Sequence, residues 1–232
     1  YDNSGAAFVF RNDPTTGWKL QSILQADGIS LHDGFGTSVA ISGTTIVIGS
    51  PGAGASGESY VFELLGSTWR QTDTISHVGS MQFGNSVAVD VDTIVVGAVG
   101  SNAAYVFDLT TDGWVEDTRH SLAGVSGSAF GTDVAIDAGR IIVGSPDAVG
   151  KGSAIIYADS TSGWDLEQTL TANDGVAGDD FGQSVSISAT SVLVGASGVS
   201  NGTMAPGAGA ASFFALGDTV WTQDPRVALD LS

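Results

Sequence analysis

The chain repeats one pattern of hydrophobic and polar positions, and the first complete copy runs from Phe35 to Trp69. In that copy a Phe-Gly pair precedes an alternating stretch at 38–41, a continuous β-branched run at 45–48, a short aromatic stretch at 60–62 and a tryptophan. Each run is too short for a helix, so each predicts a β-strand. The first two runs are separated by three residues, which favours a hairpin between them.

Three further copies keep this register, because successive Phe-Gly pairs are spaced by 48, 47 and 51 residues. A four-strand repeat of this length predicts the blade of a β-propeller. We expect the phenylalanine to wedge between neighbouring blades, the glycine to allow a close backbone approach or a positive φ, and the tryptophan to cover the adjacent sheet. These expected packing residues are Phe35, Gly36, Phe83, Gly84, Phe130, Gly131, Phe181, Gly182, Trp18, Trp69, Trp114, Trp164 and Trp221.

The N-terminal residues match only the second half of the repeat, since 6–10 correspond to the third strand and Trp18 to the fourth. The fold class is therefore an all-β propeller of four-stranded antiparallel blades, with four complete blades and a half blade in one domain. The predicted units are 1–34 (the half blade), 35–82, 83–129, 130–180 and 181–232. A propeller closes its ring to leave no free sheet edge. We expect a segment of a larger, seven-bladed ring; a five-bladed ring with one incomplete blade is the alternative.

The residues that carry a family resemblance are Phe35-Gly36, Gly49-Ser50-Pro51, Tyr60-Val61-Phe62 and their later counterparts. Through them nearly the whole chain resembles the FG-GAP repeat family. The resemblance implies an extracellular or cell-surface β-propeller, similar to the head of integrin α-subunits and to secreted and surface proteins of microbes. Integrin-type blades carry an Asp-x-Asp-x-Asp-Gly calcium loop between their first two strands. The corresponding turns here hold three residues with at most two carboxylates, so that calcium site is not expected.

Charge and composition exclude several functions. The chain has 25 acidic and 7 basic residues, a net charge of −18, which disfavours nucleic acid and anionic membranes as partners and suits cations or basic partners. It has no cysteine, which excludes disulfides, cysteine-based zinc sites and thiol catalysis. The sequence contains no run of 18 apolar residues, so no segment of it is expected to insert into a membrane.

Acidic residues precede two of the four Phe-Gly pairs and are the candidate metal ligands. Clustered aspartates in a glycine-rich loop supply the oxygen ligands that Ca²⁺ prefers. The alternative is a polar turn in which aspartate accepts backbone hydrogen bonds, and two linkers without carboxylates favour it. The candidate ligands are Asp27, Asp33, Asp174, Asp179 and Asp180. Separately, Asn201 begins a glycosylation sequon in the long loop 197–209.

Catalysis finds little support in the sequence. His32, His77 and His120 fall in separate repeats, and no nucleophile elbow or phosphate loop is present. No cofactor is expected beyond calcium in the acidic linkers. We expect an extracellular recognition or adhesion module that binds protein or glycan through loops on one propeller face. The alternatives are a structural subunit of an extracellular assembly, built from copies of the chain or further blades, and an enzyme with a site in the central channel.

Overall fold

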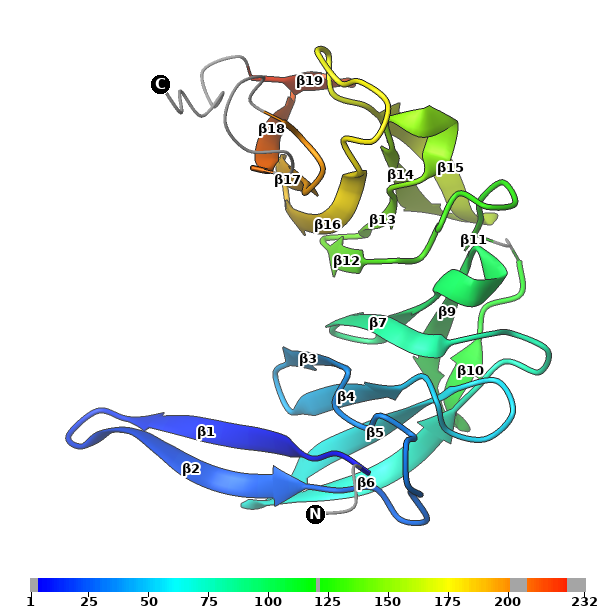
Figure 1. The fold of residues 1–232 in the computed structure, drawn as a ribbon. Coiled ribbons are helices and arrows are strands. Elements are labelled where there is room, and N and C mark those ends of the chain that lie inside the picture. Colours follow the sequence, from blue (N-terminus) through cyan, green and yellow to red (C-terminus); the bar gives the residue numbers. More distant parts are fainter. Residues whose placement is uncertain (1–3, 120–121, 201–207, 225–232) are drawn as a thin grey trace.

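The computed structural model describes residues 4–119, 122–200 and 208–224. Throughout these ranges the chain forms antiparallel β-sheets and no α-helix, which confirms the all-β prediction. Four sheets contain the four strands of a complete blade, and the fifth contains two strands. The sheets follow one another in an arc, with β3, β7, β12 and β16 on its inner side and the half blade at one end (Figure 1).

Each sheet is built from strands that are consecutive in the chain. The half blade consists of β1 (Ala7–Asp13) and β2 (Gly17–Leu24). Blade 1 consists of β3 (Ser38–Ser42), β4 (Thr45–Ser50), β5 (Glu58–Leu65) and β6 (Thr68–Ile75). Blade 2 consists of β7 (Phe83–Asp90), β8 (Thr93–Ala98), β9 (Ala103–Thr110), β10 (Gly113–Glu116) and β11 (Leu122–Ala123). Blade 3 consists of β12 (Val134–Asp137), β13 (Arg140–Ser145), β14 (Ser153–Ser160) and β15 (Gly163–Leu170), and blade 4 of β16 (Phe181–Ser188), β17 (Ser191–Ala196), β18 (Ala210–Leu216) and β19 (Trp221–Gln223).

Two short 3₁₀-helices lie in the connections between the second and third strands of a blade. They are η1 (Val99–Ser101) in blade 2 and η2 (Ala148–Gly150) in blade 3. No described helix is long and apolar enough to cross a lipid bilayer.

The hydrophobic core lies between blades, and each of four clusters joins two consecutive sheets. Strand β4 shows why its sequence is continuously apolar. Ile46 and Ile48 pack in the cluster shared with the half blade, whereas Val47 between them packs against blade 2. Because both faces of the strand are covered, alternation with polar residues is absent.

Blade 2 departs from the expected pattern at its outer edge. Strand β10 ends at Glu116, and β11 then pairs with the same neighbour, β9, through Leu122 and Ala123. The N–H of Asp117 still donates to the carbonyl of Val106 at 2.8 Å, so the backbone leaves the ladder after this residue. The outer strand is thus split in two, which the repeat pattern does not predict.

Candidate functional site

The Phe-Gly pairs lie at the junctions between blades. Each phenylalanine ring is buried, and in blades 1, 2 and 4 it packs edge-on or tilted against aromatic rings of its own blade's third strand. In these three blades its backbone N–H donates across the junction; that of Phe83, for example, donates to the Ser56 carbonyl in blade 1 at 3.0 Å. The ring therefore packs on its own blade while the backbone N–H bonds to the preceding blade. Together these contacts fix the start of the inner strand between two blades.

The glycine of the pair combines a positive φ with close contact to the preceding blade. Its φ is 90° at Gly36, 87° at Gly84, 87° at Gly131 and 100° at Gly182. A Cβ atom at Gly84 would lie 2.5 Å from the Glu58 carbonyl oxygen, and one at Gly182 would lie 2.2 Å from that of Ser153. Any other residue would have both backbone strain and a clash with backbone atoms, so glycine is required here.

Four of the five tryptophans are buried against the sheet of the preceding blade. These are Trp69, Trp114, Trp164 and Trp221, each in the cluster shared with that blade. Two of their indole N–H groups also reach across: Trp69 donates to Gln21 at 3.4 Å and Trp221 to Glu167 at 3.2 Å. Trp18 differs, because 71% of its surface is exposed. The half blade is the first sheet of the array, so no described sheet covers this ring.

The candidate metal ligands do not form a cation site among the described residues. Within the ranges that the structure describes, no three acidic or histidine side chains gather closely enough to hold a metal ion. Asp179 is buried and accepts a 2.7 Å hydrogen bond from the N–H of Val176, and Asp33 accepts one from Ser30 in the corresponding turn. The calcium expectation for Asp27, Asp33, Asp174, Asp179 and Asp180 thus has no geometric support, since two of these carboxylates cap turns. Asn201 lies outside the described residues.

The turns that precede the Phe-Gly pairs form one end of the propeller. Antiparallel blades place the linkers 25–34, 76–82, 124–129 and 171–180 at the same strand ends as the second-to-third-strand connections. Backbone hydrogen bonds tie the two sets together, as in Gly52 N–H to the Asp33 carbonyl at 2.9 Å and Asp147 N–H to that of Ser128 at 3.1 Å. We call this surface the loop face.

Aliphatic side chains project from the loop face at equivalent positions. Val78, Val125 and Val176 each lie five residues before a Phe-Gly pair, and their exposed fractions are 94%, 69% and 64%. Leu31 in the first linker and Met81 in the second are also more than half exposed. None of these side chains belongs to a described core cluster. The repeat spacing of the valines was visible in the sequence, but only the structure shows that they are exposed.

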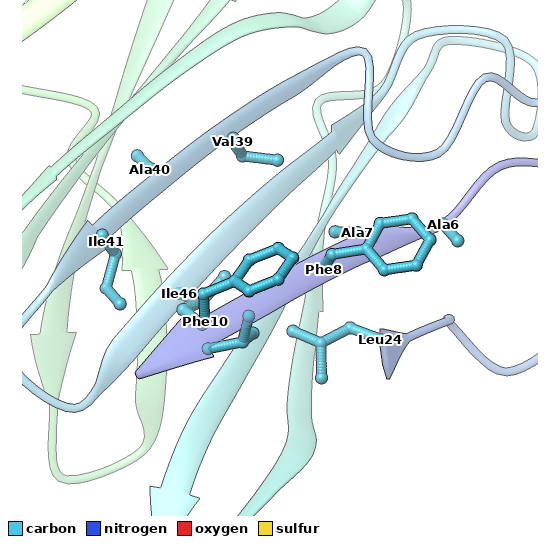
Figure 2. Close-up of a pocket in the computed structure, with 10 residues that line it drawn as sticks. Ala6, Ala7, Phe8, Phe10, Leu24, Val39, Ala40, Ile41 and Ile46 are labelled. Atoms are coloured by element: carbon cyan, nitrogen blue, oxygen red, sulfur yellow. The ribbon is translucent and has the colours of Figure 1, made fainter. Parts of the chain in front are cut away.

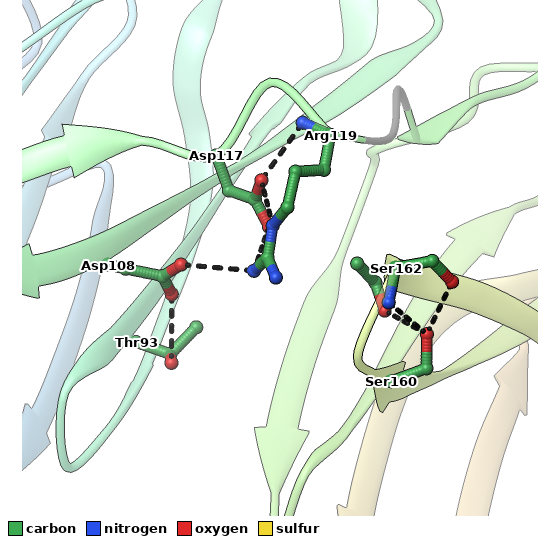
Figure 3. Close-up of polar contacts among 7 residues, drawn as sticks. Thr93, Asp108, Asp117, Arg119, Ser160 and Ser162 are labelled. Atoms are coloured by element: carbon green, nitrogen blue, oxygen red, sulfur yellow. Dashed lines mark hydrogen bonds and ion pairs between the residues drawn. The ribbon is translucent and has the colours of Figure 1, made fainter.

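The side chains drawn in Figure 3 include an ion-pair cluster where the outer strand of blade 2 is interrupted. Arg119 binds the Asp117 carboxylate through two 2.8 Å hydrogen bonds, and its guanidinium lies 3.6 Å from Asp108. Burial and the charge of Asp117 raise the pKa of Asp108, while Thr93 and Arg119 oppose the rise. The arrangement neutralises carboxylates beside the broken strand, and we assign it a structural role.

The histidines do not converge. His77 stacks on Tyr105 with ring centroids 4.0 Å apart, and its Nδ1 lies 3.0 Å from both Glu116 carboxylate oxygens. His32 occupies the linker into blade 1 with a φ of 73°, and His120 lies outside the described residues. His77 therefore joins the linker into blade 2 to that blade's third and outer strands.

Comparison with solved structures supports the same architecture. A candidate 6-phosphogluconolactonase from Bacteroides uniformis aligns with a TM-score of 0.62 at 12% identity, over 94% of this chain and 62% of that one. A functionally unknown protein from Desulfotomaculum acetoxidans aligns with a TM-score of 0.63 at 14% identity, over 96% of this chain and 63% of that one. The chain thus spans less than two thirds of either structure, and at these identities the likeness concerns the fold alone.

Comparison with families gives a direct assignment. No curated protein matches the sequence. The model of the FG-GAP repeat matches residues 18–62, 76–107 and 164–214, which together make up more than half of the chain. These segments contain three of the four Phe-Gly pairs whose junction geometry is described above. The chain therefore belongs to the FG-GAP repeat family and is a β-propeller module of the protein-interaction type.

Proposed function

We propose that the chain is a recognition module that binds a partner protein through its loop face, and that it acts outside the cell. The observation that carries the proposal is the exposure of Val78, Val125 and Val176 at equivalent positions of three linkers. Side chains that no blade packing requires, repeated on one end of a rigid scaffold, are typical of an interaction surface.

Charge narrows the chemistry of the partner. The whole chain has a net charge of −18. On the loop face the carboxylates lie in two of the four linkers: Asp27 and Asp33 accompany Leu31, and Asp174 and Asp180 accompany Val176. The linkers of Val78 and Val125 carry no carboxylate. A partner surface that presents apolar side chains among lysines and arginines would match this face in both respects. We therefore favour a basic protein segment over a glycan. The extracellular location rests on family membership.

Two other functions receive less support. The activity in the name of the Bacteroides uniformis structure belongs to a protein that shares 12% identity with this chain, and we do not transfer it. Assembly of the chain with further copies is the second alternative, since the half blade exposes an apolar end.

A peptide display library selected on the whole chain tests the proposal. We expect enriched peptides to combine basic and apolar residues and to bind at least 10-fold more weakly to a variant with Val78→Ser, Val125→Ser and Val176→Ser. The control is Leu166→Ser on the outer strand of blade 3, where an exposed leucine lies away from the loop face. Equal binding of the selected peptides to the triple variant would overturn the proposal.

A further inference from the structure

An apolar groove opens where the half blade meets blade 1. It has a volume of about 500 Å³ and is lined by β1, by Leu24 and by the inner strands of blade 1. Phe8 and Phe10 lie along β1, and Val39 and Ile41 lie along β3 (Figure 2). All four side chains are more than half exposed. One edge of β1 has no described neighbouring strand, because the two-stranded sheet contains only β1 and β2.

The same chain shows what covers the equivalent positions in the other blades. Val39 pairs with Ile48 as Val87 pairs with Val96, yet Val39 is 61% exposed and Val87 is 8% exposed. Val87 and Val89 are covered by blade 1, whose central strand contributes Val47 to the shared cluster. Among the described residues, the half blade has no strand that contributes a counterpart of Val47.

The aromatic side chains of β1 have a counterpart as well. The bulge between Val9 and Phe10 matches that between Val61 and Phe62, which aligns β1 with β5. Phe10 therefore corresponds to Phe62, whose ring lies 6.2 Å from Phe35. In blade 1 the ring of Phe35 thus packs on Phe62, whereas the equivalent side chain in the half blade, Phe10, is exposed.

We propose that this groove is a binding site for one β-hairpin with the sequence pattern of the two inner strands of an FG-GAP repeat, supplied by a repeat outside residues 1–232. Its second strand would pair antiparallel with β1, with a glycine opposite Ala7 and β-branched residues opposite Phe8, Val9 and Phe10. This register copies blade 1, in which Gly49 faces Ser59 and the run 46–48 faces 60–62.

The glycine in that register is a specific requirement. At the other junctions the central-strand glycine lies against the carbonyl oxygen of the next Phe-Gly pair: a Cβ atom would lie 2.0 Å from it at Gly49 and 2.3 Å at Gly97. In the groove the corresponding oxygen belongs to Gly36. An occupant with a larger residue opposite Ala7 would clash with that carbonyl, so a generic apolar strand does not satisfy the site.

A second copy of this chain fits the groove less well. Each Phe-Gly hairpin of the chain is already paired within its own blade, so another copy has no free hairpin to donate. A further repeat is therefore the occupant that the geometry favours.

The experiment uses a synthetic peptide with the sequence of residues 130–145, which is the inner hairpin of blade 3 and carries Asp133, Asp137 and Arg140 for solubility. A fluorescent label on the peptide reports binding to the whole chain by anisotropy. We expect saturable one-to-one binding and slower hydrogen exchange of the β1 amides. A scrambled peptide of the same composition should bind at least 10-fold more weakly, and so should a peptide with Gly144→Val.

Matched protein variants locate the binding. The double variant Val39→Asp and Ile41→Asp should weaken binding at least 10-fold, whereas Leu166→Asp, an exposed leucine on blade 3, should bind like the unmodified chain. Because all three positions are exposed, each variant should retain its circular dichroism spectrum. Three outcomes would overturn the proposal: no binding, equal binding of the scrambled peptide, or self-association of the chain that the double variant abolishes. None of these readouts involves the loop-face valines, so the outcome of this experiment is independent of the test of the proposed function.

Discussion

Gly144 of β13 and Gly182 of β16 approach so closely that a Cβ atom at position 144 would lie 2.0 Å from the Gly182 carbonyl oxygen. Gly49 and Gly97 make the same approach to the next blade, but Gly195 does not, because no described blade follows blade 4. The three atoms nearest to a Cβ atom at Gly195 would all belong to Ser184, the closest being its hydroxyl oxygen at 2.3 Å. The four glycines therefore offer an internal comparison between closed and open junctions.

Gly144→Ala should destabilise the protein far more than Gly195→Ala. The first substitution forces two backbones apart, and we expect a loss of roughly 3 kcal/mol in the free energy of unfolding, at the upper end for an overpacked site. The second requires only rotation of the Ser184 hydroxyl, so we expect less than about 1 kcal/mol. Denaturant unfolding of both variants measures the difference, and equal losses would contradict the proposed junction.

Val91→Gly should stabilise the hairpin between β7 and β8. Val91 has a φ of 49°, in the left-handed region that a β-branched residue rarely occupies. Relief of this strain outweighs the added entropy of glycine in the unfolded chain, so we expect a gain of roughly 0.5–1 kcal/mol. Val115→Gly in the regular strand β10 is the control and should be destabilising. A loss of stability on Val91→Gly would show that the strain is unimportant.

Tyr157 should make stability fall at alkaline pH. Burial raises the pKa of its phenol to about 12, against 10.0 for an unperturbed tyrosine. Since the folded state holds the neutral form more tightly, this contribution is fully present below pH 10 and is lost as the pH rises through about 12. Ultraviolet titration of the chain and of Tyr157→Phe isolates the phenol. A Tyr157 signal that titrates at pH 10 in the folded protein would refute the assignment.

Arg119→Gln should raise the pKa of Asp108. The guanidinium lies 3.6 Å from this carboxylate and lowers its pKa, whereas burial and Asp117 raise it. Carboxyl chemical shifts followed by NMR from pH 2 to pH 7 would report the change. Arg140→Gln is the matched control, because Arg140 pairs with Glu167 in blade 3. If the Asp108 titration responded equally to both substitutions, the cluster at the strand break would not be a local ion-pair network.

The sequence predicts the blades well because the repeat encodes local and junction geometry together. The apolar run 46–48 indicates a strand covered on both faces, and the structure places Val47 against one neighbour and Ile46 and Ile48 against the other. The Phe-Gly spacing likewise predicts where junctions fall. These features depend on residues close in the chain or repeated at a fixed interval.

Other features depend on tertiary context that the pattern does not carry. Asp33 and Asp179 look like metal ligands in the sequence, but in the fold they accept backbone hydrogen bonds from their own turns. The interruption of the outer strand at Asp117 involves ion pairs between non-adjacent residues. The sequence also does not predict that Val78 and Trp18 are exposed, since a valine or a tryptophan in a repeat is ordinarily assigned to the core.

The central claim is that one edge of β1 is unpaired among the described residues, in contrast to the corresponding strand of each complete blade. Residue-resolved hydrogen exchange measures this directly, because β5 is bonded on both sides to β4 and β6. Some amides of β5 donate hydrogen bonds to β4. We predict that the amides at the equivalent positions of β1 exchange at least about 100-fold faster than those β5 amides. Exchange in β1 as slow as in β5 would contradict the account, because it would mean that the edge is already paired.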